Sequence, residues 1–279
     1  MGGPEFVVVG HITKDLLPEG GSTVGGTVTY SALTARNLGY RAGILTSAAG
    51  DLPVDGLLDG IDLCVIPSPV TSTFENIYLD GSRLQYIRAV ARPIGREDYP
   101  AAWLGARVVH LGPLAQEISP DFLRLFERSL VGVTPQGWMR RWDATGRVHP
   151  KEWEGAEEVL SRAEVLIFSE EDVERDAAVI RRYAGLARIM VVTQARRGAT
   201  VYCRGAHPRH FPAFAAVEVD PTGAGDVFAA AFLLKLAETQ DPYVSARFAN
   251  CAASFSVEKK GVLGIATLEQ VQGRLRGRL

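Results

Sequence analysis

Cysteine is scarce in this chain of 279 residues, and the three that occur form no metal-binding or disulfide pattern. Cys64, Cys203 and Cys251 are odd in number and far apart, which is typical of a reduced, cytoplasmic protein without structural zinc. An excess of one charge is also missing, since 30 basic and 32 acidic residues give a formal net charge of −2. Such a balance has no electrostatic footprint for nucleic acid.

Long apolar runs are missing too. No stretch is long enough to span a bilayer, and residues 1–10 lack the basic start and apolar core of a signal peptide. We therefore expect neither membrane insertion nor export. The first apolar run is not followed by Gly-x-Gly-x-x-Gly, and no Gly-Lys dipeptide occurs. These absences disfavour a dinucleotide-binding oxidoreductase and a Walker-type NTPase.

Short apolar runs alternate with helical patterns along the whole chain. Buried strands are predicted at residues 6–10, 42–47, 63–65, 107–111, 131–133, 165–168 and 189–193. Helices are predicted at about 27–38, 120–128, 153–162 and 173–184. This alternation predicts an α/β fold with a mostly parallel sheet covered on both faces. No linker or repeat interrupts it, so residues 1–279 are interpreted as a single domain.

One segment departs from the alternation. Residues 71–79 and 83–87 are strand-like and flank Asp80-Gly81-Ser82, a turn sequence typical of β-hairpins. The pattern predicts a hairpin over about 71–88, which we expect to form a small lid with part of 12–24. A surface hairpin without a role in catalysis is the alternative.

The most specific motif lies at residues 219–228. Gly223 and Gly225 stand between two carboxylates, Asp220 and Asp226, and an apolar run of helical character follows. The glycine turn brings backbone N–H groups to a helix N-terminus, which is a place that binds anions. Asp226, in the first helical turn, is suited to accept a proton during phosphoryl transfer. An ordinary helix start without catalytic role is the alternative.

The segment 220–226 resembles the C-terminal signature of the PfkB (ribokinase-like) family of sugar and nucleoside kinases, and residues 25–39 resemble its N-terminal glycine segment. The resemblance extends over nearly the whole chain, from about residue 6 to 265. It implies a ribokinase-like three-layer αβα sandwich with a small β-lid, ATP and Mg²⁺ as cofactors, and a small sugar or polyol as acceptor. In some relatives a monovalent cation such as K⁺ is held near Val219 and Lys260-Gly261, and the lid makes homodimer contacts.

The resemblance also assigns roles on the acceptor side. Asp226 is implied to be the general base, with Gly223, Ala224 and Gly225 forming the anion hole. Asp15 matches a position that accepts sugar hydroxyl protons, and Gly25-Gly26 match a glycine pair that lets the substrate approach the backbone. The remaining candidate acceptor contacts are Tyr30, which stands where many sugar kinases have Asn, and Asn76 and Arg140.

On the nucleotide side, residues 168–172 match the family's Asn-x-x-Glu near magnesium, with Ser169 in place of Asn and Asp172 in place of Glu. Asp172 is the implied metal-side acid, and Glu171 is its alternative. Residues 191–199 match Thr-x-Gly-x-x-Gly, with Ala195 replacing the first Gly. The candidate nucleotide-binding residues are Ser169, Thr193, Arg196, Gly198, Thr222 and Asn250. A solvated basic turn is the alternative for Arg196.

Residues 134–143, together with Tyr30 and Ser169, are similar to the myo-inositol kinase-like branch of the family. That similarity implies an inositol-like polyol as the acceptor. A nucleoside kinase of the same family, or a catalytically silent sensor that only binds its ligand, is the alternative.

Overall fold

A nine-stranded central sheet organises the computed structural model, which describes residues 2–50, 52, 54, 56–79 and 82–277. The strand order is β15-β14-β13-β12-β9-β8-β1-β4-β5. All neighbours from β13 to β5 are parallel, whereas β14 and β15 are antiparallel. The strands are β1 (Phe6–Val9), β4 (Ala42–Ala48), β5 (Asp62–Pro67), β8 (Val108–Leu111), β9 (Leu130–Val133), β12 (Val165–Ser169), β13 (Ile189–Thr193), β14 (Ala199–Cys203) and β15 (Arg209–Phe211).

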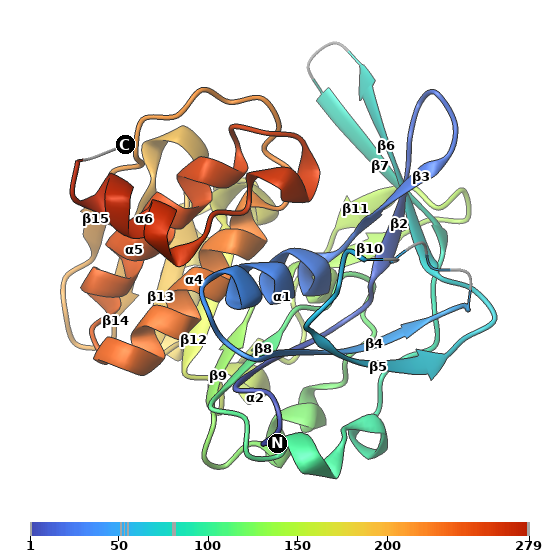
Figure 1. Cartoon of the computed structure of the whole chain (residues 1–279), viewed down its shortest axis with the longest axis horizontal. Helices are drawn as coiled ribbons and strands as arrows, with labels where there is room; N and C mark the ends of the chain where they lie inside the picture. Colours follow the sequence, from blue (N-terminus) through green and yellow to red (C-terminus); the bar gives the residue numbers. More distant parts are fainter. Residues whose placement is uncertain (1, 51, 53, 55, 80–81, 278–279) are drawn as a thin grey trace.

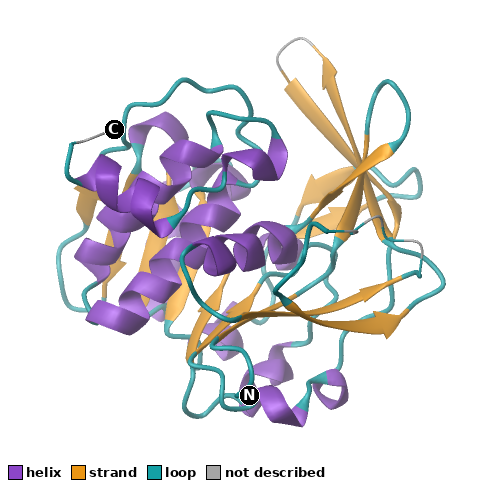
Figure 2. Cartoon of the chain, viewed as in Figure 1, coloured by secondary structure: helices purple, strands orange, loops and turns teal. Residues whose placement is uncertain are grey.

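Helices cover both faces of this sheet (Figures 1 and 2). One face packs against α1 (Thr27–Asn37), α4 (Ala224–Thr239), α5 (Pro242–Ser256) and α6 (Leu268–Leu275), and the other against α2 (Ala156–Leu160) and α3 (Ala177–Leu186). Phe6 and Val8 point into the first core, and Val7 and Val9 into the second, as the two-residue period of a strand requires. The predicted fold class is thereby confirmed.

A second, four-stranded sheet projects from the carboxyl edge of the first, at the upper right of Figure 1. Its order is β3-β2-β6-β7, formed by β2 (Thr13–Leu16), β3 (Ser22–Gly25), β6 (Ser72–Leu79) and β7 (Ser82–Ala89). β6 and β7 pair antiparallel; residues 80–81 of the predicted Asp-Gly turn lie outside the described residues. We call these four strands the lid. A hairpin of β10 (Arg140–Trp142) and β11 (Val148–Pro150) touches the lid through a bridge between Tyr86 and Arg147.

Several predicted helices are shorter than the sequence pattern indicates. The 120–128 segment is a 3₁₀ helix over Pro120–Leu125, and the 153–162 segment is helical only at α2. Trp153 is fully buried and stacks on Trp138 with ring centroids 5.5 Å apart, so its position is set by packing before α2 begins. None of the helices in the described part of the chain is long and apolar enough to cross a membrane.

Candidate active site

Asp226 lies in the first turn of α4, where charged residues from distant segments gather around it. The charges of Asp172, Arg140 and Asp15 all act on its carboxylate, and Thr27 in the first turn of α1 donates a hydrogen bond to it. Desolvation by burial raises the pKa of Asp226 to about 6; Asp172 and Asp15 add to the rise, while Thr27 and Arg140 oppose it. A carboxylate with this pKa is ionised at neutral pH and basic enough to accept a proton.

The turn before α4 is held open by glycine. Gly223 has φ of 75°, which is the left-handed region, and a Cβ at this position would lie 2.2 Å from ring atoms of Tyr30. The backbone N–H groups of Gly223, Gly225 and Asp226 find no hydrogen-bond partner among the described residues. Three unpaired donors at the positive end of a helix form a nest for an anion directly beside Asp226.

Asp220 anchors this turn to the C-terminal part of the chain. Its Oδ1 accepts from the Thr222 N–H at 2.9 Å and its Oδ2 accepts from the Gly261 N–H at 2.8 Å. Burial would raise the pKa of Asp220, but these hydrogen bonds and the charge of Lys260 lower it. The carboxylate therefore orients the turn, and its oxygens are already occupied by backbone donors.

Asp15 and the glycine pair lie together at the root of the lid. A Cβ on Gly25 would lie 2.1 Å from Asp15 Oδ2, so the absence of a side chain gives the carboxylate its place. Thr13 Oγ1 donates to Asp15 Oδ1 at 3.2 Å. Gly26 has φ of 91° and is the N-cap of α1, and a Cβ there would lie 2.6 Å from the His11 carbonyl oxygen. Asp15 therefore lies near the N-terminus of α1, and its charge reaches Asp226 in the first turn of α4.

The other predicted acceptor contacts occupy different places. Arg140 lies close enough to influence Asp226. Asn76 is half-buried in the lid, where its Oδ1 accepts from Gln85 Nε2 at 3.0 Å. Tyr30 is only 5% exposed, and its ring supports Gly223 from below. The Tyr30 ring therefore packs against the turn before α4, and its contact with the acceptor stays a prediction.

A second group of predicted residues follows β12. Ser169 caps the short helix of residues 170–173, with its Oγ accepting from the Glu171 N–H at 3.2 Å. Asp172 Oδ2 accepts from the Ser169 N–H at 2.9 Å and its Oδ1 from Gln136 Nε2 at 3.3 Å, while its charge reaches Asp226. Glu171 is exposed and pairs with Arg175 at 3.4 Å. Asp172 is thus the acid that faces the site.

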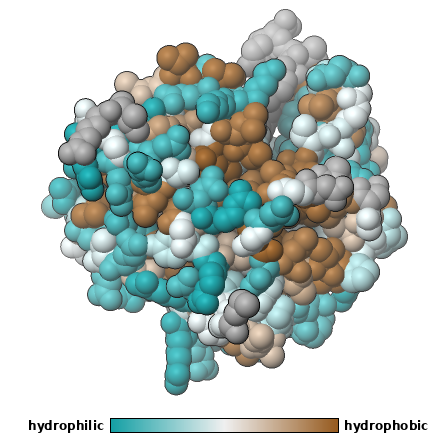
Figure 3. Space-filling model, in the orientation of Figure 1, coloured by the Kyte–Doolittle hydropathy of each residue, from teal (hydrophilic) through white to brown (hydrophobic). Residues whose placement is uncertain are grey.

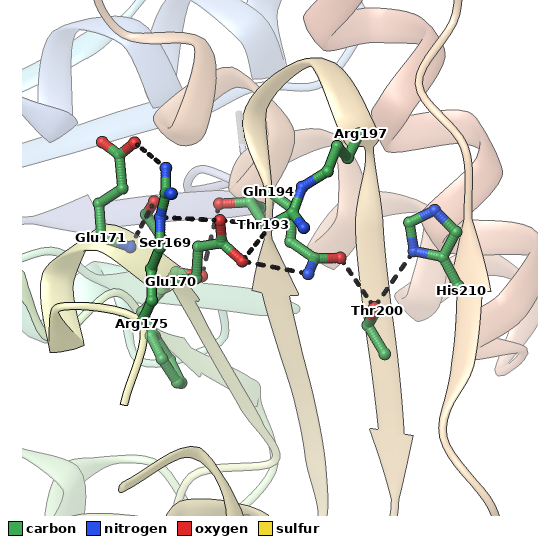
Figure 4. A network of polar contacts seen from close by, with 10 residues as sticks. Ser169, Glu170, Glu171, Arg175, Thr193, Gln194, Arg197, Thr200 and His210 are labelled. Carbon is green, nitrogen blue, oxygen red and sulfur yellow. Dashed lines mark hydrogen bonds and ion pairs between the residues drawn. The ribbon is translucent and has the colours of Figure 1, made fainter. Parts of the chain in front are cut away.

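Glu170 was missed by the sequence reasoning, although its environment is the most polar of the group (Figure 4). Its buried carboxylate accepts from Arg197 Nη2 with both oxygens and from Gln194 Nε2 at 3.2 Å, and it pairs with Arg175 at 3.3 Å. Burial would raise the pKa of Glu170, but these hydrogen bonds and charges lower it. The carboxylate therefore ties the turn after β12 to the turn after β13. The sequence did contain an indication of this contact, because three consecutive acidic residues (170–172) follow one predicted strand and two arginines (196–197) follow the next.

We expect Glu170→Gln to weaken donor binding more than acceptor binding. The substitution removes the charge that holds Arg197 and Arg175, so the turns after β12 and β13, where the resemblance implies the nucleotide, lose their common anchor. The expected effects are a donor KM higher by about 3- to 10-fold and a stability lower by about 1–2 kcal/mol. Steady-state kinetics with Mg-ATP varied, together with urea unfolding, measures both.

Glu164→Gln is the matched control. Glu164 directly precedes β12, whereas Glu170 directly follows it, and Glu164 pairs with Arg188 at 3.0 Å. An exposed pair of this kind contributes about 0–1 kcal/mol and leaves the donor KM unchanged. Equal donor KM changes in the two variants would contradict the role given to Glu170.

The turn after β13 contains an alanine with positive φ. Ala195 adopts φ of 49°, in the left-handed region that favours glycine. Gly198 has φ of 102°, and a Cβ there would lie 2.1 Å from the Phe211 carbonyl oxygen. Asn250 Nδ2 donates to that same carbonyl at 3.0 Å, and Arg196 is exposed and pairs with Glu218 at 3.0 Å. Thr193, whose hydroxyl reaches the Phe168 carbonyl, ends the strand.

Apolar side chains are unusually exposed beside this turn. Val217, Val219 and Leu263 are 79%, 55% and 75% exposed, and the backbone around them is joined through the Asp220–Gly261 contact. Figure 3 shows apolar surface gathered between the helical half of the molecule and the lid. Among the described residues, no three His, Cys, Asp or Glu side chains gather into a metal-binding group.

Glu117 joins the loops beneath the lid. It is 2% exposed, and its carboxylate accepts from the backbone N–H groups of His11, Leu114 and Ala115 at 2.7–3.0 Å. The strand β2 thus leaves the core from a fixed point. The sequence reasoning did not single out this residue.

The comparisons with known proteins agree with this arrangement. Residues 152–267 match the model of the pfkB family carbohydrate kinases. Cytidine kinase of Thermococcus kodakarensis is 29% identical over 257 residues, which are 82% of this chain and 87% of that protein. A pyrophosphate-dependent kinase of the ribokinase family, solved with a pyrophosphate analogue and myo-inositol, superposes with a TM-score of 0.80 at 22% identity over 96% of this chain and 99% of its own. Arabidopsis thaliana ribokinase, solved with ribose and ATP, superposes with a TM-score of 0.75 at 19% identity, over 98% of this chain and 99% of its own.

The fold is ribokinase-like, and the Asp226 carboxylate lies beside the turn at the N-terminus of α4. Part of the chain, residues 152–267, is thus similar to the pfkB family of carbohydrate kinases, and most of the chain is similar to a cytidine kinase.

Proposed function

We propose that this protein is a kinase of the PfkB family, which transfers the γ-phosphoryl group of ATP to a hydroxyl of a small sugar or polyol, with inositol-like compounds favoured. The observation that carries the proposal is the Asp226 carboxylate, its pKa raised to about 6, beside the unpaired N–H groups of the Gly223–Gly225 turn. Asp15, next to the same site, is a double acceptor suited to neighbouring hydroxyls.

The reaction needs one base and one anion hole. Asp226 takes the proton of the acceptor hydroxyl while the hydroxyl oxygen forms a bond to the γ-phosphorus. The bond from that phosphorus to the β,γ-bridging oxygen breaks, and ADP leaves. The N–H groups of Gly223 and Gly225 stabilise the charge on the transferring group, which is the main form of catalysis in phosphoryl transfer.

The donor side supports a nucleotide. Val217, Val219 and Leu263 are exposed apolar side chains, which are suited to contacts with a purine ring and not to contacts with a bare pyrophosphate. Mg²⁺ usually binds through one or two carboxylates and substrate phosphates. We assign this role to Asp172, because its charge reaches Asp226. When bound, the ion neutralises phosphate charge. K⁺ near Val219 and Gly261, and a homodimer formed through the lid, are further proposals from the resemblance.

A nucleoside acceptor is the second candidate. The cytidine kinase of Thermococcus kodakarensis matches most of this chain, which favours a nucleoside as strongly as the segment 134–143 favours a polyol. Both candidates place a hydroxyl against Asp226, and they differ in what the lid must cover.

A matrix of donors and acceptors tests the proposal. Purified protein is incubated with Mg-ATP or Mg-pyrophosphate and with myo-inositol, ribose, fructose or cytidine, with and without KCl, and the phosphorylated products are measured by mass spectrometry. We expect product from ATP and myo-inositol. Cytidine phosphate as the main product selects the second candidate, pyrophosphate as the better donor overturns the ATP assignment, and no product from any pair rejects the proposed function.

A further inference from the structure

A histidine is buried in the middle of the central sheet with one ring nitrogen unpaired. His110 lies on β8, paired in register with Val8 and Gly132, and its ring packs 6.4 Å from that of Phe6. The side chain is fully buried. Its Nε2 lies 3.0 Å from the hydroxyl of Thr134, while its Nδ1 has no hydrogen-bond partner.

Burial decides which nitrogen carries the proton. It lowers the pKa of His110 to about 3, so the ring is neutral at pH 7. A proton on Nδ1 would leave a buried N–H without an acceptor, which is rarer in proteins than an unpaired acceptor. The proton therefore belongs on Nε2, which donates to Thr134 Oγ1. Because that oxygen already accepts, the hydroxyl proton of Thr134 is available for another partner.

Thr134 lies at the floor of the candidate active site. It directly follows β9, and its N–H donates to the Leu111 carbonyl at the carboxyl ends of the strands. A Cβ on Gly112 would lie 2.3 Å from Thr27 Cγ2 and 3.3 Å from Thr134 Oγ1, so the two threonines flank one glycine. Thr27 is the residue that donates to Asp226. Thr134 is partly exposed, whereas His110 behind it is not.

The direction of α4 places this hydroxyl below the base. Leu233 packs over Gly132, since a Cβ there would lie 2.3 Å from Leu233 Cδ2. Ala237, farther along α4, accepts from Arg107 at the start of β8. The helix thus runs from the carboxyl edge of the sheet to the amino edge, and its first turn stands above Thr134.

We propose that the Thr134 hydroxyl donates a hydrogen bond to an oxygen of the acceptor substrate, and that His110 is the positioning residue that fixes this orientation. The inference rests on the proposed function, since it names a further contact in the same acceptor site. Thr134 and His110 together would thus help to determine which acceptor binds, with Thr134 in contact with the acceptor and His110 buried behind Thr134.

Thr134→Val and Thr134→Ser separate the hydroxyl from the shape of the side chain. Loss of one such hydrogen bond is expected to raise the acceptor KM by about 3- to 10-fold in Thr134→Val, with the donor KM unchanged, and Thr134→Ser should stay close to the wild type. Thr239→Val is the control, because it makes the same change on an exposed residue at the C-terminal end of α4, far from Asp226 in the first turn. An unchanged acceptor KM in Thr134→Val overturns the proposal.

His110 is tested through its partner. His110→Leu is expected to raise the acceptor KM in the wild-type background and to add nothing in the Thr134→Val background, whereas His110→Gln, which keeps a donor, recovers part of the loss. A residue that only fills the core would give additive effects and lower stability alone. Additivity therefore overturns the positioning role.

Two readouts do not depend on turnover. In ¹⁵N NMR spectra at pH 7, the Nε2 of His110 should carry the proton, and a proton on Nδ1 overturns the assignment. Calorimetric titration of myo-inositol, ribose and cytidine into wild type and Thr134→Val compares acceptor binding directly. Equal affinity in both proteins, or no binding by the wild type, overturns the Thr134 contact. Binding that is weakened by the variant, without any phosphorylated product, rejects the proposed function and keeps this contact.

Discussion

Asp226→Asn is expected to lower kcat by about 10²- to 10⁴-fold, because the amide cannot accept the proton of the attacking hydroxyl. The substrate KM values should change little, since the side chain keeps its shape. The measurement is a steady-state assay with the best donor and acceptor found in the screen. An Asp226→Asn variant with more than a tenth of the wild-type kcat would contradict the assignment of the base.

The same residue sets an expected pH dependence. The pKa of Asp226 is about 6, and the base form is the ionised one, so kcat/KM should fall tenfold per pH unit below pH 6 and level off above pH 7.

The folded pKa lies above the unfolded value of 3.8, so the folded state binds the extra proton, and stability is lost as pH rises through 6. Asp226→Asn should therefore be more stable than the wild type by about 3 kcal/mol at pH 8 and nearly equal to it at pH 4. Urea unfolding at both pH values provides the comparison.

Gly223→Ala and Gly225→Ala are expected to impair the enzyme for different reasons. Alanine at position 223 meets the Tyr30 ring and adopts φ of 75°, which together cost about 2–4 kcal/mol of stability and distort the anion nest. A kcat lower by about 10²- to 10³-fold follows, as for the loss of an anion-hole donor.

Alanine at position 225 meets no atom within 4 Å, and as a better helix former it should leave stability unchanged or raise it by up to about 1 kcal/mol. Its methyl group instead occupies space that the phosphoryl group needs, and kcat should fall at least tenfold. Stability is measured by urea unfolding and activity by initial rates. A fully active Gly225→Ala protein would show that the phosphoryl group does not approach this part of the turn.

Much of this architecture could be predicted from short segments of the sequence. The parallel strands are continuous apolar runs because both of their faces are buried, and the Gly223–Asp226 turn is recognisable because its residue types are tied to one conformation. The edge strands β14 and β15 were not predicted. They are short and partly exposed, and β15 with its Arg209 and His210 has no apolar pattern to recognise.

The parts of the site that escaped prediction depend on contacts between distant residues. Glu117 meets His11 across 106 positions, and Glu170 meets Arg197 across 27, so neither partner is marked in its own segment. Tyr30 was predicted to contact the acceptor from its place in a motif, and the motif did not indicate that its ring also packs against Gly223, because α1 and α4 are distant in sequence and adjacent in space. Side-chain direction in such cases is set by packing, and a motif does not encode it.

The separation of the lid from α4 has an evolutionary consequence. The lid strands β2 and β3 lie between β1 and α1 in the chain, and β6 and β7 follow β5. The proposed base and anion nest, in contrast, belong to one helix, α4, which packs on the central sheet. Mutations that lengthen or reshape the outer part of the lid, away from Asp15 at its root, therefore leave the reacting groups and their support untouched. A lineage with this layout can change the compound that it phosphorylates by drift in the lid while its chemistry stays constant.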